Sequence, residues 1–163
     1  NHTLDNAHAI QDAGASWLTV HARTKADGYT PPAYWEKIQP ITEALNINVI
    51  ANGEIWNNSD AKTCLQQSHC QDIMLGRGAV TTPDLSLCIR QNNDATVLSW
   101  QDLIELQQRF LTGQYKTEIG MIGRYKQWLG MMSKAYPEAQ QLWTQVKRIK
   151  QLEQIIEYLD KSC

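Results

Sequence analysis

The sequence predicts an α/β half followed by an all-α half, and two patterns lead to that prediction. In the first half, short apolar runs of strand length alternate with segments of helical pattern, as in folds whose parallel strands are covered by helices. In the second half the strand-like runs stop, and apolar residues recur every three or four positions, which is typical of amphipathic helices. The polar, Asn-rich stretch at 90–99 separates the two patterns, so we expect domains at 1–92 and 93–163.

Three strands are expected in the first half, at "WLTVHA" (17–22), "NVIA" (48–51) and "DIMLG" (72–76). Three parallel strands cannot bury both faces of a sheet by themselves. The spacing of about 25–30 residues per unit suits a (β/α)8 barrel. We therefore interpret residues 1–92 as the last three β/α units of such a barrel, strands 6–8, followed by a C-terminal helical bundle.

Helical segments precede and follow the first two strands. A helix is expected over 6–14 and is closed by Gly14, because glycine ends helices readily. The segment 34–45 has a helical pattern that Pro40 must kink or restart.

Two further helices are expected around the third strand. The helix at 58–68 has Asn58 or Ser59 as its cap. In the segment "TTPDLSLCI", Thr82 is placed to cap a helix and Pro83 to occupy its first position.

Three amphipathic helices are expected in the second half. The first begins with Ser99 and Asp102, which have the spacing of a capping box. The three apolar stripes are Trp100, Leu103, Leu106 and Phe110; Ile122, Tyr125, Trp128 or Leu129, and Met132; and Leu142, Val146, Ile149, Leu152, Ile156 and Leu159.

Composition limits the class of protein. Hydrophobic residues make up 42% of the 163 residues, which is enough for a buried core. Neither an apolar run of about 18 residues nor a signal-peptide pattern occurs, so we expect no membrane association. The four cysteines form no C-x-x-C pair, which favours reduced thiols, no metal and a cytoplasmic location. The chain does not begin with Met, and we interpret it as a fragment of a longer protein.

Polar residues and glycines follow each expected strand at the point where the strand ends. In a parallel barrel the loops after the strands line the active site, and those after the last two strands commonly bind phosphate. The sequence therefore predicts one site that contains His21, Arg23, Asn52, Gly53, Glu54, Gly76 and Arg77.

The chemistry of this set suits a cofactor that carries a phosphate. Gly53 and Gly76 allow close approach of backbone N–H groups, a helix after Gly76 would offer its N-terminus, and Arg77 adds a charged hydrogen bond. His21 can donate to, or protonate, a polar ring atom. Structural roles are the alternatives: a hydrogen-bonded rim histidine, glycines in tight turns and a solvated arginine.

Four stretches resemble the tRNA-dihydrouridine synthase family, most closely its subfamily C. They are "LTVHARTK" (18–25), "VIANGEI" (49–55), "DIMLGRGA" (72–79) and "GRYKQWL" (123–129). The resemblance implies a flavin-binding barrel with a helical RNA-binding domain. It also implies that His21 lies beside the flavin, that Asn52, Gly53 and Glu54 hold FMN, and that Gly76 and Arg77 contact its phosphate.

The catalytic acid of the family is absent from this chain. In the family it is a cysteine in an Asn-x-Gly-Cys-Pro type motif, upstream of the stretches found here, and no such motif occurs. The resemblance therefore implies no catalytic residue in this fragment, and Cys64, Cys70, Cys88 and Cys163 do not take that role.

Basic and aromatic residues are interleaved in the second half. Residues 116–150 carry 7 Lys and Arg against 2 Asp and Glu, although the whole chain has a net charge of −2. Such a surface suits RNA; the alternative is a solvated helix face, and for Trp128 and Trp143 we favour the core. The residues expected to contact RNA are Lys25, Tyr29, Lys116, Arg124, Lys126, Gln127, Lys147, Arg148 and Lys150.

The resemblance implies that the full-length protein reduces a specific uridine in tRNA to 5,6-dihydrouridine with FMN, and with NADPH as the reductant. The fragment alone is expected to be inactive and to self-associate through its open sheet edge. The alternatives are a non-catalytic RNA-binding module and another FMN-dependent barrel oxidoreductase that acts on a small molecule. A small-molecule enzyme has no need of the basic stretch at 116–150.

Overall fold

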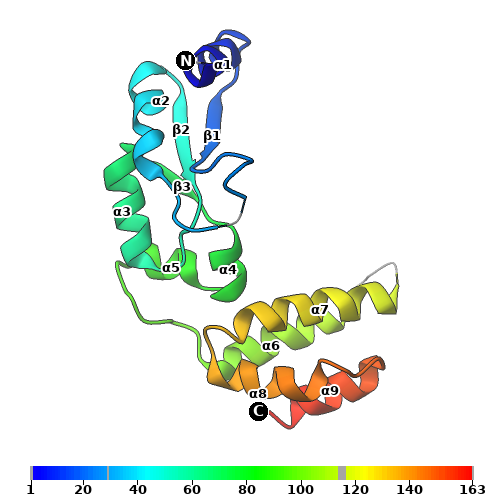
Figure 1. Ribbon diagram of the computed structural model, residues 1–163. Coiled ribbons are helices and arrows are strands. Elements are labelled where there is room, and N and C mark those ends of the chain that lie inside the picture. The colour runs from blue at the N-terminus through cyan, green and yellow to red at the C-terminus, as the bar shows by residue number, and fades with distance from the viewer. Residues whose placement is uncertain (1, 29, 114–116, 163) are drawn as a thin grey trace. The chain divides into compact units, whose positions relative to one another are not determined.

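The computed structural model describes residues 2–28, 30–113 and 117–162, and the chain divides into two compact units (Figure 1). The first unit contains residues 1–79 and 85–94, and the second contains 80–84 and 95–163. Residues 80–84 belong to the second unit because hydrogen bonds tie them to it. The Asp84 carboxylate accepts the N–H groups of Val97 and Leu98 at 2.5 and 2.9 Å.

The first unit is built on a parallel three-stranded sheet in the order β1-β2-β3. The strands are β1 (Trp17–His21), β2 (Asn48–Asn52) and β3 (Asp72–Met74). Within the described residues, β1 and β3 pair only with β2, so each has one edge without a partner strand. Trp17 and Met74, on these outer strands, are 63% and 45% exposed. A parallel sheet with two open edges is what part of a barrel would show.

Helices pack against this sheet. Helix α1 (His2–Asp12) packs against β1, and α2 (Gln39–Ala44) and α3 (Asn58–Ser68) pack against β2. Figure 1 shows α2 and α3 beside the strands. The core between helices and sheet includes Ile38, Ile41, Val49, Ala51 and Cys64, each at most 4% exposed. The alternation of strands and helices predicted from the sequence is confirmed.

Two local details follow the predicted residues closely. Gly14, after α1, has a φ of +90°, a conformation that glycine adopts without strain. Pro40 restarts the helical segment, because the 3-10 helix η1 (Trp35–Lys37) ends before α2, in which Pro40 occupies the first turn.

Two predicted helix starts were wrong. The cap of α3 is Asn57, whose side-chain oxygen accepts the Asp60 N–H at 2.8 Å, and not Asn58 or Ser59. The helix expected to start at Thr82 and Pro83 starts later, as α5 (Leu85–Arg90), after a separate short helix α4 (Arg77–Thr81). Asp84 directly precedes α5, and its carboxylate is bonded to the N–H groups of Val97 and Leu98.

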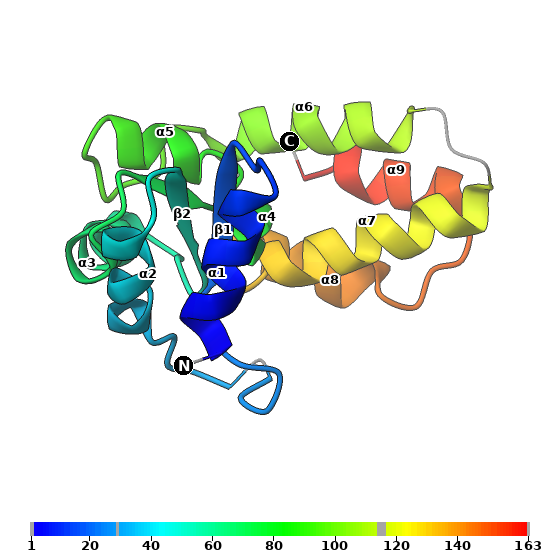
Figure 2. The same cartoon turned by 90° about the horizontal axis from the view of Figure 1, so that it is seen from above.

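The second unit contains four helices among its described residues: α6 (Trp100–Leu111), α7 (Glu118–Met132), α8 (Pro137–Val146) and α9 (Leu152–Asp160). Helix α7 packs against α8, and α6 packs against α9 (Figure 2). They share one core, in which Leu103, Tyr125, Leu129, Val146 and Leu159 are fully buried. The predicted capping box is present, with the Asp102 N–H bonded to Ser99 Oγ and the Ser99 N–H to the Asp102 carboxylate.

The third apolar stripe forms two helices where the sequence predicted one. The chain turns between Val146 and Leu152, and the Lys126 ammonium of α7 donates to the carbonyls of Lys147, at 3.1 Å, and Ile149. Those carbonyls lie in the turn that follows α8, where helical carbonyls lack intrahelical partners. The side chain from α7 therefore compensates for the break.

Across the described ranges, no helix combines the length and apolar character needed to cross a membrane.

Candidate functional site

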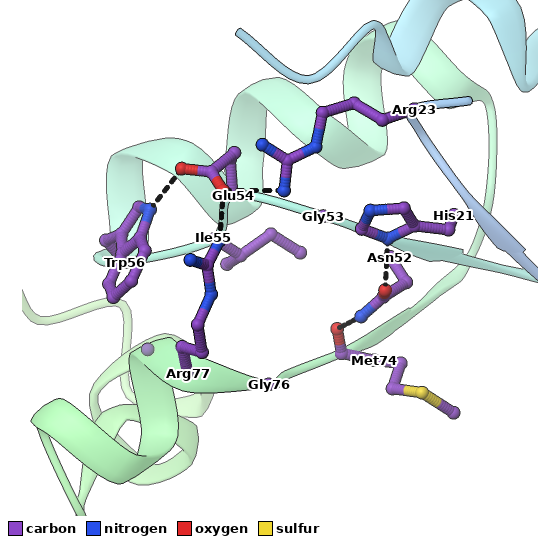
Figure 3. Close-up of a pocket in the computed structure, with 11 residues that line it drawn as sticks. His21, Arg23, Asn52, Gly53, Glu54, Ile55, Trp56, Met74, Gly76 and Arg77 are labelled. Atoms are coloured by element: carbon purple, nitrogen blue, oxygen red, sulfur yellow. Dashed lines mark hydrogen bonds and ion pairs between the residues drawn. The ribbon is translucent and has the colours of Figure 1, made fainter. Parts of the chain in front are cut away.

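The carboxyl ends of the three parallel strands lie at the same end of the sheet. The register pairs His21 with Asn52, and Asn52 with Met74. A cavity of about 400 Å³ lies at this carboxyl end of the sheet (Figure 3). It is lined by His21, Arg23, Asn52, Gly53, Glu54, Ile55, Trp56, Met74, Gly76, Arg77 and Gly78. All seven residues expected from the sequence to bind a cofactor are therefore in one place.

Glu54 links the two arginines of the cavity. Its Oε1 accepts from Arg23 at 2.8 Å and from Arg77 at 2.5 Å, and its Oε2 accepts the Trp56 indole N–H at 2.9 Å (Figure 3). The Arg77 guanidinium also lies 5.2 Å from the Trp56 ring, in a cation–π contact. One carboxylate thus faces two cations, which leaves the cavity wall with a positive balance that suits an anion.

The environment of Glu54 stabilises its ionised form. Burial raises the pKa of this carboxyl, but the Trp56 hydrogen bond and the charges of Arg23 and Arg77 outweigh burial, so the pKa lies below its ordinary value of 4.5. Glu54 therefore stays charged at neutral pH and keeps both guanidinium groups in place.

The arginines differ in how much freedom they have. The Arg23 side chain is 1% exposed and also donates to the Thr30 carbonyl, at 3.2 Å. The Arg77 side chain is 41% exposed and belongs to the first residue of α4. Arg77 is therefore the arginine that can reach a ligand, whereas Arg23 is part of the wall.

The three glycines of the cavity differ in how strongly the protein itself requires a residue without a side chain. Gly53 has a φ of +129°, where a side chain would strain the backbone. At Gly78 a Cβ would lie 2.1 Å from the Ile55 carbonyl oxygen, so only glycine fits. At Gly76 a Cβ would meet nothing within 4 Å. The protein itself makes no steric demand at Gly76, and the missing side chain leaves room for a ligand.

With this geometry in place, comparison with known proteins identifies the family. The family model for dihydrouridine synthase (Dus) matches residues 1–162. The chain belongs to the dihydrouridine synthase family.

Individual members of the family match over most of the chain. It is 44% identical over 163 residues to the tRNA-dihydrouridine(16) synthase of Shewanella oneidensis, covering 98% of this chain and 50% of that protein. It is 41% identical to the protein of the same name from Pseudomonas putida, with 89% and 46% covered. The Neisseria meningitidis protein of that name is also 41% identical, with 93% and 47% covered. The chain thus spans about half the length of the relatives it matches.

Sequence reasoning missed four residues that line the cavity: Ile55, Trp56, Met74 and Gly78. Trp56 had a usable signal, because it follows Asn52-Gly53-Glu54 directly in the same loop. Gly78 had one too, because it completes the Gly-Arg-Gly sequence at 76–78. Met74 contributes a backbone carbonyl, and nothing in its residue type indicates that role.

The described cysteines of this family member do not line the cavity. Cys64 is on α3 and Cys88 on α5, and both are buried, as is Cys70. Burial, with a smaller effect of Cys70, raises the pKa of the Cys64 thiol to about 12, so this group stays protonated and is a poor nucleophile or acid. Cys163 lies outside the described residues.

Most residues expected to contact RNA are on the surface. Lys25 is exposed after β1, Arg124 and Gln127 are exposed on α7, and Lys147, Arg148 and Lys150 are exposed around the end of α8. Lys126 differs, because its ammonium is bonded to two backbone carbonyls. Burial and the nearby Lys150 lower the pKa of Lys126. Tyr29 and Lys116 lie outside the described residues.

The tryptophans of the second unit pack against its core, as the sequence analysis favoured. Trp128 and Trp143 are partly buried beside the fully buried side chains of that core. Trp128 also donates its indole N–H to the Val80 carbonyl at 3.1 Å. In the part of the chain that the structure describes, no three His, Cys, Asp or Glu side chains are grouped to hold a metal ion.

Proposed function

We propose that the protein containing this chain reduces a uridine of tRNA to 5,6-dihydrouridine, with FMN as cofactor and NADPH as reductant. One observation carries the proposal: in a chain of this family, the polar residues and glycines that follow three successive strands line a single cavity. The related proteins are named tRNA-dihydrouridine(16) synthases, and we extend position 16 to this protein on that basis.

In this proposal the chain contains two parts of a larger enzyme, the end of a barrel and a helical domain. The three-stranded sheet is strands 6–8 of a (β/α)8 barrel, and residues 93–163 form a helical tRNA-binding domain. The parallel strand order and the two unpaired edges support the first part. The exposed basic residues around the end of α8 support the second. An enzyme with this substrate would work in the cytoplasm.

The cavity residues fit a flavin with a phosphate. Arg77 is exposed enough to bind the phosphate, and the open space at Gly76 allows the phosphate to approach the backbone. Gly53 lies beside the His21 ring, whose Cε1 would be 3.3 Å from a Cβ at position 53. His21 is therefore placed to contact the polar edge of a ring.

When bound, FMN would supply the hydride chemistry that reduction of the base needs. In this proposal the residues of this chain hold the cofactor, and the three described cysteines lie outside the cavity lining. A uridine inside an RNA must leave its stack to enter such a site. The second unit would hold the tRNA while that happens, through cations that neutralise phosphates.

Arg77→Ala tests the phosphate assignment in the full-length protein. Loss of a charged hydrogen bond costs about 1.5–3 kcal/mol, so we expect FMN affinity to fall roughly 10- to 100-fold. Riboflavin, which lacks the phosphate, should bind both proteins equally well. Arg90→Ala, on the exposed side of α5 and outside the cavity, is the matched control.

The reaction is tested by measuring dihydrouridine in tRNA after incubation with FMN and NADPH. Formation of dihydrouridine at position 16 supports the proposal. Reduction of a small molecule with tRNA unchanged would favour a different flavin oxidoreductase. Equal FMN affinity of the Arg77→Ala and wild-type proteins would remove Arg77 from the phosphate site.

A further inference from the structure

The His21 side chain makes one hydrogen bond to the described residues, and its geometry identifies a protonated ring nitrogen. His21 Nδ1 lies 2.6 Å from Asn52 Oδ1, and Asn52 Nδ2 lies 2.7 Å from the Met74 carbonyl oxygen (Figure 3). A backbone carbonyl only accepts hydrogen bonds. The Asn52 group that faces Met74 must therefore be the amide NH₂, because the reverse orientation would bring two acceptors together.

The orientation of the Asn52 amide then decides which tautomer the neutral His21 ring adopts. With its NH₂ turned to Met74, Asn52 presents its oxygen to Nδ1, and only a protonated Nδ1 can donate to an oxygen. In a neutral imidazole one nitrogen carries the proton and the other is an acceptor. In the neutral form of His21, Nε2 is thus the nitrogen with the lone pair.

The strand register keeps this chain of hydrogen bonds in place. Asn52 is the last residue of β2, and it is paired with His21 of β1 on one side and Met74 of β3 on the other. Adjacent strands fix all three positions, and the last acceptor in this series of hydrogen bonds is a backbone carbonyl, that of Met74. Nε2 has no hydrogen-bond partner among the described residues.

We propose that Asn52 is a positioning residue that holds neutral His21 in the Nδ1–H tautomer, so that Nε2 acts as a hydrogen-bond acceptor at the cavity. The ligand group that meets His21 is then a donor, an N–H or O–H. Arg77 provides donors elsewhere in the same cavity. The cavity therefore selects a ligand with an anionic group and, separately, a hydrogen-bond donor.

Nitrogen NMR of the protein with ¹⁵N-labelled histidine tests the tautomer without any ligand, so the result does not depend on the proposed function. The chain has four histidines, and His21→Gln assigns the signal. His8, exposed on α1, serves as a reference for a solvated ring. A single net hydrogen bond should shift the ratio of the two neutral tautomers by about 2- to 10-fold toward Nδ1–H in His21 relative to His8.

Two variants separate the acceptor role of Asn52 from a general structural role. Asn52→Ala removes the acceptor, and His21 should return to the ratio of His8. Asn52→Asp keeps an oxygen beside Nδ1 but cannot donate to Met74, and it should retain the Nδ1–H preference. An Nε2–H tautomer in the wild-type protein, or a ratio unchanged by Asn52→Ala, would overturn the proposal. If Asn52→Ala does not fold, loss of the preference in Asn52→Asp has the same consequence.

Discussion

At the scale of single residues, Glu54 organises the cavity. It has a φ of +50°, which is uncommon for a residue other than glycine. In that conformation its carboxylate contacts the guanidinium groups of Arg23 and Arg77 and the indole of Trp56. A strained backbone at a residue with this many polar contacts is typical of a functional site.

Glu54→Gln should destabilise the protein in a pH-dependent way. The substitution leaves the buried Arg23 without its counter-ion, and we expect a loss of about 1–3 kcal/mol of unfolding free energy at neutral pH. Because the pKa of Glu54 lies below 4.5 in the folded state, its contribution is complete at pH values well above 4.5 and disappears as the pH falls through the folded value.

Urea denaturation of both proteins at a series of pH values checks this prediction. The difference between wild-type and Glu54→Gln should be constant around neutral pH and should shrink as the pH falls through the lowered folded-state pKa of Glu54. Glu36→Gln, an exposed acidic residue of η1 outside the cavity, should change little and serves as the control. A constant difference down to the lowest pH would show that the ionised carboxylate is not the stabilising group.

The residues of the cavity could be predicted from the sequence only in part. His21, Asn52 and Gly76 were predictable together because parallel strands end at one edge of a sheet. The role of Glu54 was not, because its contacts depend on a left-handed backbone and on an arginine two residues beyond a different strand. From the sequence, Glu54 and the arginines were all expected to contact the cofactor, whereas the geometry shows Glu54 bonded to the arginines.

At the scale of secondary structure elements, Lys126 supports the turn between α8 and α9. Lys126→Met removes a charged donor from the carbonyls of Lys147 and Ile149. We expect a loss of about 1–2 kcal/mol from the stability of the second unit, measured by thermal or urea unfolding. Lys150→Met, an exposed cation nearby, should leave stability unchanged. Equal stability of both variants would mean that the turn holds without Lys126.

Lys147 and Arg148 should contribute to RNA binding and little to folding. Both are exposed at the end of α8, and neither side chain is part of the core of the second unit. We expect the wild-type protein to bind tRNA with an affinity that falls steeply as the salt concentration rises. Changing both residues to Glu should abolish this binding and leave the helix content constant. Binding is measured by filter retention at several salt concentrations and helicity by circular dichroism. Lys134→Glu is a control for charge reversal, and binding that survives the Lys147/Arg148 change would place the RNA elsewhere.

Element boundaries were less predictable than element types. The apolar stripe from Leu142 to Leu159 correctly indicated helix, but an apolar repeat continues across a turn when both helices face the same core. The carbonyls in the break are bonded to Lys126 from another helix, a contact between residues 21 and 23 positions apart. Local sequence cannot show it.

At the scale of the whole molecule, the assignment of residues 80–84 to the second unit could not be predicted from the sequence. The predicted boundary lay in the Asn-rich stretch after residue 90, where composition changes. In the structure the second unit also takes in 80–84, through Asp84 and through the Val80 carbonyl that accepts from Trp128. Composition indicates where a linker lies. A compact unit is defined by contacts, and these can include a segment from earlier in the sequence, such as 80–84.

The chain expressed alone should self-associate through the open edge of β1. This strand pairs with β2 on one side only, within the described residues, and its Trp17 is 63% exposed. Unpaired edges recruit other strands, and a lysine on the edge opposes that pairing. Light scattering should therefore give a mass above that of the monomer, and Trp17→Lys should lower it. Ile119→Lys, which replaces an even more exposed apolar residue in the second unit, should have no effect. A monomeric chain, or self-association abolished by Ile119→Lys and not by Trp17→Lys, would contradict an interface at the sheet edge.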